Sequence, residues 1–172
     1  FKLTVEELEK KVTPRTKAIL IGYPNNPTGT VMDRESLVKI ADFAQKHDLV
    51  VISDEIYCDL TYEGTHTCFA SLPGMKERTL TMNGFSKSYA MTGLRIGYIC
   101  GPREIMEQIY KVHQYEILCA SVTSQYGAIA ALKYCDDDVK AMYDEYAARR
   151  EMVYEGLKKI GLSVFKPKGA FY

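Results

Sequence analysis

The sequence lacks an excess of charge of either sign, a long apolar run and any closely spaced pair of cysteines. Lysine plus arginine equals aspartate plus glutamate, at 22 each, and no basic cluster stands out. We therefore expect neither nucleic acid nor an anionic membrane surface as a partner. The longest apolar runs, around Ala18–Gly22 and Leu49–Ile52, are too short to span a bilayer.

The cysteines are odd in number and widely spaced, which argues against a disulfide framework or a structural zinc site. They are Cys58, Cys68, Cys100, Cys119 and Cys135. A reducing cytoplasm is the expected setting. The chain begins at Phe1 rather than Met and stops at Tyr172, just after a Pro-Lys-Gly turn. We expect it to be an excerpt from a longer protein, whose targeting segments would lie outside it.

Short apolar runs alternate with longer amphipathic ones, which is typical of an α/β protein. Strands are predicted at Ala18–Tyr23, Leu49–Ser53, Thr79–Phe85 and Arg95–Cys100. Predicted helices cover Leu3–Val12, the segment capped by Asp33, the segment that starts at Gly101-Pro102, Ser121–Tyr134 and Asp136–Ile160. The helix capped by Asp33 has an apolar stripe of Leu37, Ile40, Ala41 and Ala44. The inner face of the last helix would include Val139, Met142, Tyr146, Val153 and Leu157. Gly161 would end the last helix, and Leu162–Phe165 would begin a different sheet.

Several polar residues stand close to predicted strands, mostly where a strand ends and an open α/β sheet places its ligands. Asn26 follows the first strand, Asp54 and Tyr57 follow the second, and Lys87 follows the third. Arg95 stands at the start of the fourth strand. Each residue also has an ordinary structural explanation, such as a turn, a helix cap or a solvated cation.

Three longer blocks contain these residues: Tyr23-Pro-Asn-Asn-Pro-Thr-Gly-Thr30, Ser53-Asp-Glu-Ile-Tyr57 and Gly84-Phe-Ser-Lys-Ser-Tyr-Ala-Met-Thr-Gly-Leu-Arg-Ile-Gly-Tyr98. Together, and with the closing Gly169-Ala-Phe-Tyr172, they resemble the class I/II aminotransferases, which are pyridoxal-phosphate enzymes of fold type I. The resemblance extends over essentially the whole chain. One such block is weak evidence, whereas three in the family's order are strong.

The resemblance implies a role for each polar residue toward pyridoxal 5′-phosphate. Lys87 would be the catalytic residue: it forms the Schiff base with the cofactor and moves a proton at the substrate Cα. Asp54 would hold the proton on the ring nitrogen, and Asn26 and Tyr57 would donate to the ring oxygen. Asn26 is also a candidate for substrate binding. Arg95 would grip the phosphate with its forked donors, and Ser86 would add a hydroxyl.

One position departs from the family pattern, because many members have serine where this chain has Gly84. Glycine cannot supply the hydroxyl that serine at this position would give to the phosphate. The Schiff-base chemistry expected of Lys87 is unaffected. No metal site is expected. The acidic run Asp136–Asp138 suits the first turn of a helix, and His47, His66 and His113 have no ligand spacing, so surface or helix roles are expected for them.

The resemblance also implies a fold, namely a three-layer α/β/α large domain whose mixed sheet is mostly parallel. The four strands would be neighbours, with Arg95–Cys100 antiparallel to the others. Residues 1–138 would belong to the large domain, and residues 139–172 would form a connecting helix and the start of a small α+β domain. The phosphate cup and the ring that stacks on the cofactor would lie outside this chain, and the full enzyme would be a homodimer.

The function expected from the resemblance is ping-pong transamination between an L-amino acid and a 2-oxo acid. Little activity is expected of this chain alone. A carbon–sulfur β-lyase of the same fold is an alternative, distinguished by release of pyruvate and ammonia. A non-catalytic fragment or interaction module is an alternative of another class, although retention of the cofactor-facing residues argues against long decay of the site.

Overall fold

A computed structural model describes all residues from Phe1 to Tyr172. Four strands form one sheet in the order β1-β2-β3-β4. Strands β1, β2 and β3 are parallel, and β4 is antiparallel to β3, which confirms the predicted order and direction. The strands are β1 (Ala18–Gly22), β2 (Val50–Asp54), β3 (Thr79–Gly84) and β4 (Gly97–Cys100).

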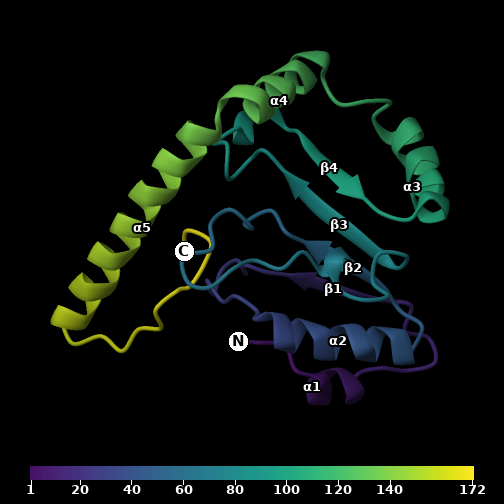
Figure 1. Ribbon diagram of the computed structural model, residues 1–172, viewed down its shortest axis with the longest axis horizontal. Coiled ribbons are helices and arrows are strands. Elements are labelled where there is room, and N and C mark those ends of the chain that lie inside the picture. Colours follow the sequence, from purple (N-terminus) through teal and green to yellow (C-terminus); the bar gives the residue numbers. More distant parts are fainter.

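The helices flank this sheet and continue beyond it (Figure 1). They are α1 (Val5–Glu9), α2 (Arg34–Lys46), α3 (Arg103–Glu116), α4 (Val122–Tyr134) and α5 (Asp136–Lys159), with short 3₁₀ turns η1 (Phe69–Ser71) and η2 (Thr92–Leu94). Helix α1 is shorter than expected. Pro102 is the N-cap of α3 rather than its first helical residue. No helix has the combination of length and apolar composition that crossing a membrane requires.

Helix α2 covers one face of the sheet because its first turn is capped and one side of it is apolar. The Asp33 side chain accepts a hydrogen bond from the Ser36 amide at 2.8 Å, which satisfies a donor of the first turn. The predicted stripe of Leu37, Ile40, Ala41 and Ala44 is buried, together with Phe43. These side chains pack on Ile19, Ile21 and Val51 of the sheet, and on Phe69, Leu72 and Met75 around η1.

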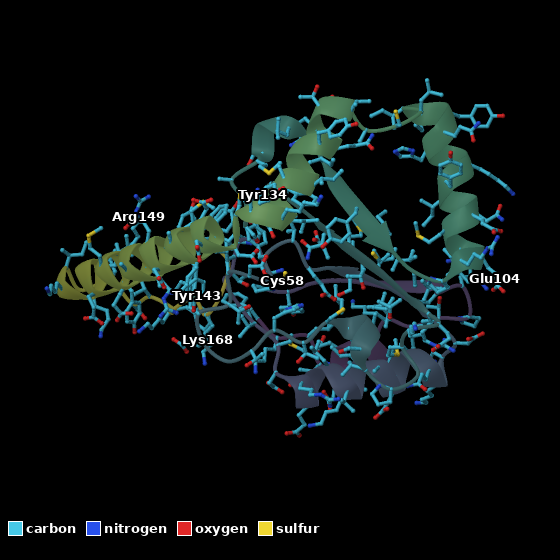
Figure 2. All side chains as sticks on the ribbon, turned by 45° about the horizontal axis from the view of Figure 1, so that its top comes forward. Cys58, Glu104, Tyr134, Tyr143, Arg149 and Lys168 are labelled. Atoms are coloured by element: carbon cyan, nitrogen blue, oxygen red, sulfur yellow. The ribbon has the colours of Figure 1, made fainter.

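The opposite face of the sheet is far more open. Leu20 alternates with the buried Ile19 and Ile21, and it is 70% exposed. Helices α3 and α4 lie on the β4 side of the molecule (Figure 1), and α3 and α5 contain no buried residue. Of the expected inner face of α5, Val153 is 53% exposed. Figure 2 shows Arg149 projecting from the outer side of α5, whereas Tyr143 lies on the side toward the C-terminal segment.

The end of α5 follows the prediction, but the strand expected after it does not form. Gly161 adopts a φ of +86°, the left-handed conformation that suits glycine at a helix end. Residues Leu162–Phe165 belong to no strand, so the predicted strand is wrong. A strand needs a neighbour to satisfy its backbone groups, and the only pairing in this region is one bridge between Thr61 and Gly169.

Candidate active site

The sheet register brings the polar strand ends together. Gly22 at the end of β1 is paired with Asp54 at the end of β2, and Asp54 is paired in turn with Met82 of β3. The turns that follow these strands carry Asn26, Tyr57 and Lys87. Parallel strands therefore deliver all four side chains to the same edge of the sheet.

At this edge lies an open hollow of about 540 Å³. Four of the six predicted cofactor-binding residues are among its lining residues, namely Asn26, Asp54, Tyr57 and Lys87. The rest of the lining comes from β1, the turn after it and Ile56. An amine, a carboxylate, an amide and a phenol thus face one space that is large enough for a small aromatic molecule.

The remaining two predicted residues, Arg95 and Ser86, do not line this hollow. The Arg95 guanidinium donates to the Thr92 carbonyl at 2.8 Å, and the Thr92 hydroxyl donates to the Ser86 carbonyl at 2.8 Å. Both residues belong to the loop between β3 and β4, in which Arg95 has a φ of +50°. The structure therefore brings together the residues expected around a cofactor ring, but not those expected around its phosphate.

Aromatic rings lie beside the Lys87 ammonium group. Its Nζ is 5.6 Å from the centroid of the Tyr57 ring and 5.6 Å from that of Phe171, within the range of a cation–π contact. The two rings meet edge to face, 5.3 Å apart. Phe171 stacks in turn on Tyr146 of α5, with centroids 5.4 Å apart. Lys87 is thus held in an apolar setting on one side, and sequence reasoning assigned Phe171 no role there.

The C-terminal segment Pro167–Tyr172 reaches this site because it docks on two loops. The Gly29 carbonyl accepts from the Lys168 and Gly169 amides at 2.8 and 3.0 Å, and the Ala170 amide donates to Leu60 at 2.9 Å. A Cβ on Gly169 would come within 2.6 Å of the Pro24 side chain. Glycine therefore permits the close approach of this segment to the turn that carries Asn26.

Tyr172, at the end of this segment, contacts two predicted site residues. Asn26 Nδ2 donates to the Tyr172 hydroxyl at 3.1 Å, and the Tyr57 hydroxyl donates to the same oxygen at 3.3 Å. Burial, reinforced by the neighbouring Tyr172 hydroxyl, raises the pKa of Tyr57 above its usual value. The Tyr57 phenol therefore remains a protonated donor at neutral pH.

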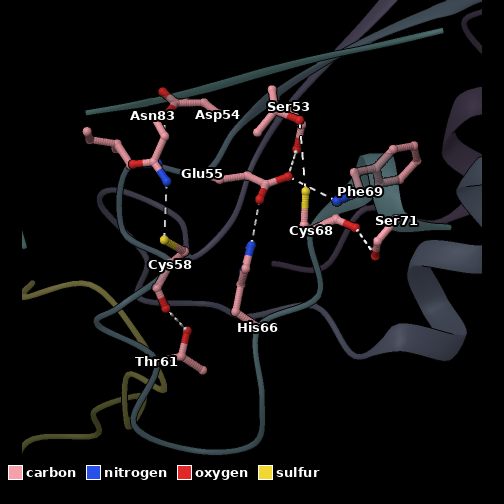
Figure 3. Close-up of polar contacts among 12 residues, drawn as sticks. Ser53, Asp54, Glu55, Cys58, Thr61, His66, Cys68, Phe69, Ser71 and Asn83 are labelled. Carbon is pink, nitrogen blue, oxygen red and sulfur yellow. Dashed lines mark hydrogen bonds and ion pairs between the residues drawn. The ribbon is translucent and has the colours of Figure 1, made fainter. Parts of the chain in front are cut away.

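Behind the site, Glu55 forms a buried polar cluster (Figure 3). Its carboxylate is 2.7 Å from His66 Nε2 and accepts from the Ser53 hydroxyl at 2.9 Å and the Phe69 amide at 3.0 Å. Glu55 is only 3% exposed. The expected surface role of His66 is wrong, because its side chain is 22% exposed and bonds to this buried acid. Sequence spacing gave no signal for a pair formed across a loop.

The chemistry of the side chains around the hollow fits the ring of pyridoxal phosphate. The aldehyde of that ring needs an amine, its basic nitrogen needs an anion, and its acidic hydroxyl needs donors. Here Lys87 offers the amine, Asp54 offers the anion, and Asn26 and Tyr57 offer the donors. No three His, Cys, Asp or Glu side chains gather in an arrangement suited to a metal ion.

Known proteins with similar sequences are aminotransferases. A sequence model of the family described as aminotransferase class I and II matches residues 1–172. An aspartate aminotransferase of Pyrococcus abyssi is 48% identical over 177 residues, which cover 100% of this chain and 45% of that protein. An aromatic-amino-acid aminotransferase 2 of Thermococcus litoralis is 47% identical over 177 residues, with the same coverage of 100% and 45%.

Solved structures give the same result. The crystal structure of an aromatic aminotransferase from Pyrococcus horikoshii superposes with a TM-score of 0.95 and 46% sequence identity, and the match covers 99% of this chain and 46% of that one. A single mutant of the aspartate aminotransferase of Thermus thermophilus superposes with a TM-score of 0.91 at 39% identity, covering 96% of this chain and 44% of that one. The chain spans less than half the length of the relatives it matches.

Proposed function

The chain belongs to the family of class I and II aminotransferases, and we propose that it is the cofactor-binding part of a longer pyridoxal-phosphate-dependent enzyme. The observation that carries this proposal is the convergence of Lys87, Asp54, Asn26 and Tyr57 on one hollow. These four residues come from three different strand ends, so their meeting is a property of the fold rather than of one local motif.

We assign each residue a separate task. The Lys87 amine is the group that would bond to the cofactor aldehyde and then carry the proton at the substrate Cα. The Asp54 carboxylate would keep a proton on the ring nitrogen, and Asn26 and Tyr57 would donate to the ring oxygen. When bound, pyridoxal phosphate supplies the electron sink for the Cα–H bond that breaks. Arg95 and Ser86 are assigned to the phosphate on the strength of the motif.

The proposed reaction exchanges the amino group of an L-amino acid with the oxo group of a 2-oxo acid, in two half-reactions of a ping-pong route. Lys87 would move the proton in both. Aspartate and the aromatic amino acids, which appear in the names of relatives, are the first donors to test. We further propose a homodimer for the full-length enzyme, and a cytoplasmic location, which the free thiol of every cysteine supports.

We place the boundary of the large domain in the first turn of α5, just after the junction of α4 and α5. Cys135 ends α4 and is also the N-cap of α5, so the chain changes direction at a single residue. Residues 1–138 would then belong to the large domain and residues 139–172 to the connecting helix and the start of the small domain. The whole sheet and the four predicted site residues that line the hollow lie before this boundary.

Covalent labelling of Lys87 tests the proposal. Full-length protein is incubated with pyridoxal phosphate, reduced with borohydride and mapped by peptide mass spectrometry. We expect the label on Lys87, its loss in Lys87→Ala, and its retention in the control Lys111→Ala, because Lys111 lies on exposed helix α3. An unlabelled Lys87 in the full-length wild type contradicts the proposal.

The products then separate the two reactions that share this cofactor. Consumption of a 2-oxo acid with formation of its amino acid identifies transamination. Release of pyruvate and ammonia, with no 2-oxo acid required, identifies a β-lyase instead.

A further inference from the structure

Asp54 lies at a strand end with little support from its neighbours across the sheet. It is the last residue of β2, and the chain turns away directly after Glu55. Gly22, its partner on β1, has no side chain to pack against it. The Asp54 carboxylate accepts one hydrogen bond, from the Ile56 amide at 3.1 Å. The direction of this carboxylate therefore depends on how firmly the backbone from Ser53 to Ile56 is held.

The two residues on either side of Asp54 are bonded to each other on the other face of the sheet. Side chains alternate along a strand, so Ser53 and Glu55 point away from the hollow that Asp54 lines. Both are buried, at 4% and 3% exposure. The Ser53 hydroxyl donates to the Glu55 carboxylate at 2.9 Å (Figure 3). This bond spans Asp54 and closes a ring through its backbone.

The Glu55 carboxylate is itself fixed, so a bond to it restrains the strand. The oxygen that accepts from Ser53 also accepts from the Phe69 amide at 3.0 Å. The other oxygen is 2.7 Å from His66 Nε2. Three separate partners thus hold one buried carboxylate, and fully satisfied polar clusters of this kind are rigid. Glu55 is the anchor to which the Ser53 hydroxyl ties the end of β2.

We propose, resting on the function proposed above, that Ser53 is a positioning residue: its bond to Glu55 holds the Asp54 carboxylate toward the ring nitrogen of the cofactor. Ser53 touches neither the cofactor nor the substrate in this role. It lines a small cavity on the α2 side of the sheet, together with Met32 and Leu37. Its effect on cofactor binding should therefore appear only where a ring nitrogen is present for Asp54 to bind.

The substitution Ser53→Ala removes the hydroxyl and leaves the backbone of β2 unchanged. The loss of one orienting hydrogen bond should weaken the binding of pyridoxal phosphate about threefold to tenfold. The comparison ligand is 1-deazapyridoxal phosphate, in which a C–H group replaces the ring nitrogen. Because Asp54 has no ring nitrogen to bind in this compound, its dissociation constant should change by less than about twofold.

Titration of the full-length protein with each compound measures the two dissociation constants, and circular dichroism checks that each variant is folded. Ser71→Ala is the matched control, because its hydroxyl also makes one bond, to the Cys68 carbonyl at 2.6 Å, and does not contact β2. We expect neither constant to change in this control. In an Asp54→Asn background, Ser53→Ala should have no further effect on pyridoxal phosphate binding, because Ser53 acts through Asp54.

Three outcomes overturn the inference and leave the proposed function intact. In the first, Ser53→Ala binds pyridoxal phosphate as tightly as the wild type does. In the second, it binds both compounds more weakly by the same factor, which is the result of a general loss of structure. In the third, its effect persists in full in the Asp54→Asn background. A wild type that binds no pyridoxal phosphate overturns the proposed function instead, and the inference fails with it.

Discussion

Asp54 and Glu55 are adjacent acids with opposite surroundings. Asp54 faces the open hollow, whereas Glu55 turns to the other side and is buried among donors. The Glu55 amide also donates to the Met82 carbonyl at 2.9 Å, which extends the pairing of β2 with β3 past Asp54. The buried carboxylate and the amide of Glu55 therefore both help to fix the end of β2, where Asp54 lies.

The pKa of Glu55 gives a prediction for stability against pH. Burial raises this pKa. Hydrogen bonds from His66, the Phe69 amide and Ser53 lower it by more than burial raises it, so the pKa of Glu55 lies below its usual value of 4.5. A group whose folded pKa is depressed stabilises the fold above its unfolded pKa and loses that contribution as pH falls. We expect Glu55→Gln to lower the free energy of unfolding by about 1–3 kcal/mol at pH 7, and by less at pH 4.

Urea denaturation of the full-length protein at the two pH values measures this difference. The control is Glu104→Gln, in the exposed first turn of α3. Its free energy of unfolding should stay close to that of the wild type at both pH values. An effect of Glu55→Gln that is the same at pH 7 and pH 4 would show that the charge of Glu55 contributes nothing.

Among the elements, the C-terminal segment Pro167–Tyr172 has the largest consequence for the site although it is neither helix nor strand. Its backbone bonds to Gly29 and Leu60 place Phe171 beside Lys87 and Tyr172 beside Asn26. The segment returns from the far end of α5 to the middle of the molecule (Figure 1). Close packing of Gly169 is therefore a condition for both aromatic contacts.

Substitution of Gly169 by alanine tests the docking of this segment. The new Cβ would meet Pro24 at 2.6 Å and Val31 at 2.9 Å, so the segment must shift. We expect a loss of about 1–3 kcal/mol in the free energy of unfolding, as for an overpacked site. Hydrogen exchange of the Ala170 amide, which bonds to Leu60, should also accelerate.

Gly156→Ala is the matched control for this substitution. A Cβ there meets nothing within 4 Å, and the position lies inside α5. Alanine should therefore stabilise the protein by about 0.5–1 kcal/mol. A Gly169→Ala protein as stable as this control would mean that the segment does not dock as described.

At the scale of the whole molecule, large apolar side chains are exposed in several places, and exposed apolar patches favour association. Leu20 on the open sheet face is 70% exposed, and Tyr115, Leu118 and Tyr126 around α3 and α4 are 90%, 72% and 70% exposed. The chain also places neither Arg95 nor Ser86 at the hollow. We therefore expect the isolated chain of 172 residues to show weak activity or none.

Self-association of the isolated chain is the corresponding prediction. Size-exclusion chromatography with light scattering should give a mass above the 19.5 kDa of one chain, or aggregation. Leu20→Lys should reduce the association, because it places a charge on the open face, whereas Glu77→Lys, at an exposed turn, should not. A stable monomer of the unaltered chain would contradict the prediction.

Local patterns in the sequence were sufficient for much of this protein. Apolar spacing and caps predicted α2 with its inner stripe, the approximate ends of the four strands, and the end of α5 before Gly161. The motifs also predicted which polar residues follow each strand. These features depend on neighbours within about one turn or one strand, and the sequence specifies those directly.

Only the tertiary structure decided what meets across the chain. It placed Phe171 and Tyr172 beside Lys87 and Asn26, paired His66 with the buried Glu55, and left Arg95 and Ser86 outside the hollow. It also left Leu162–Phe165 without a strand partner. The physical reason is the same in each case: a contact between distant residues depends on the packing of the segments that carry them. The position of Lys87 after a strand end was therefore predictable from its motif, whereas its aromatic surroundings were not.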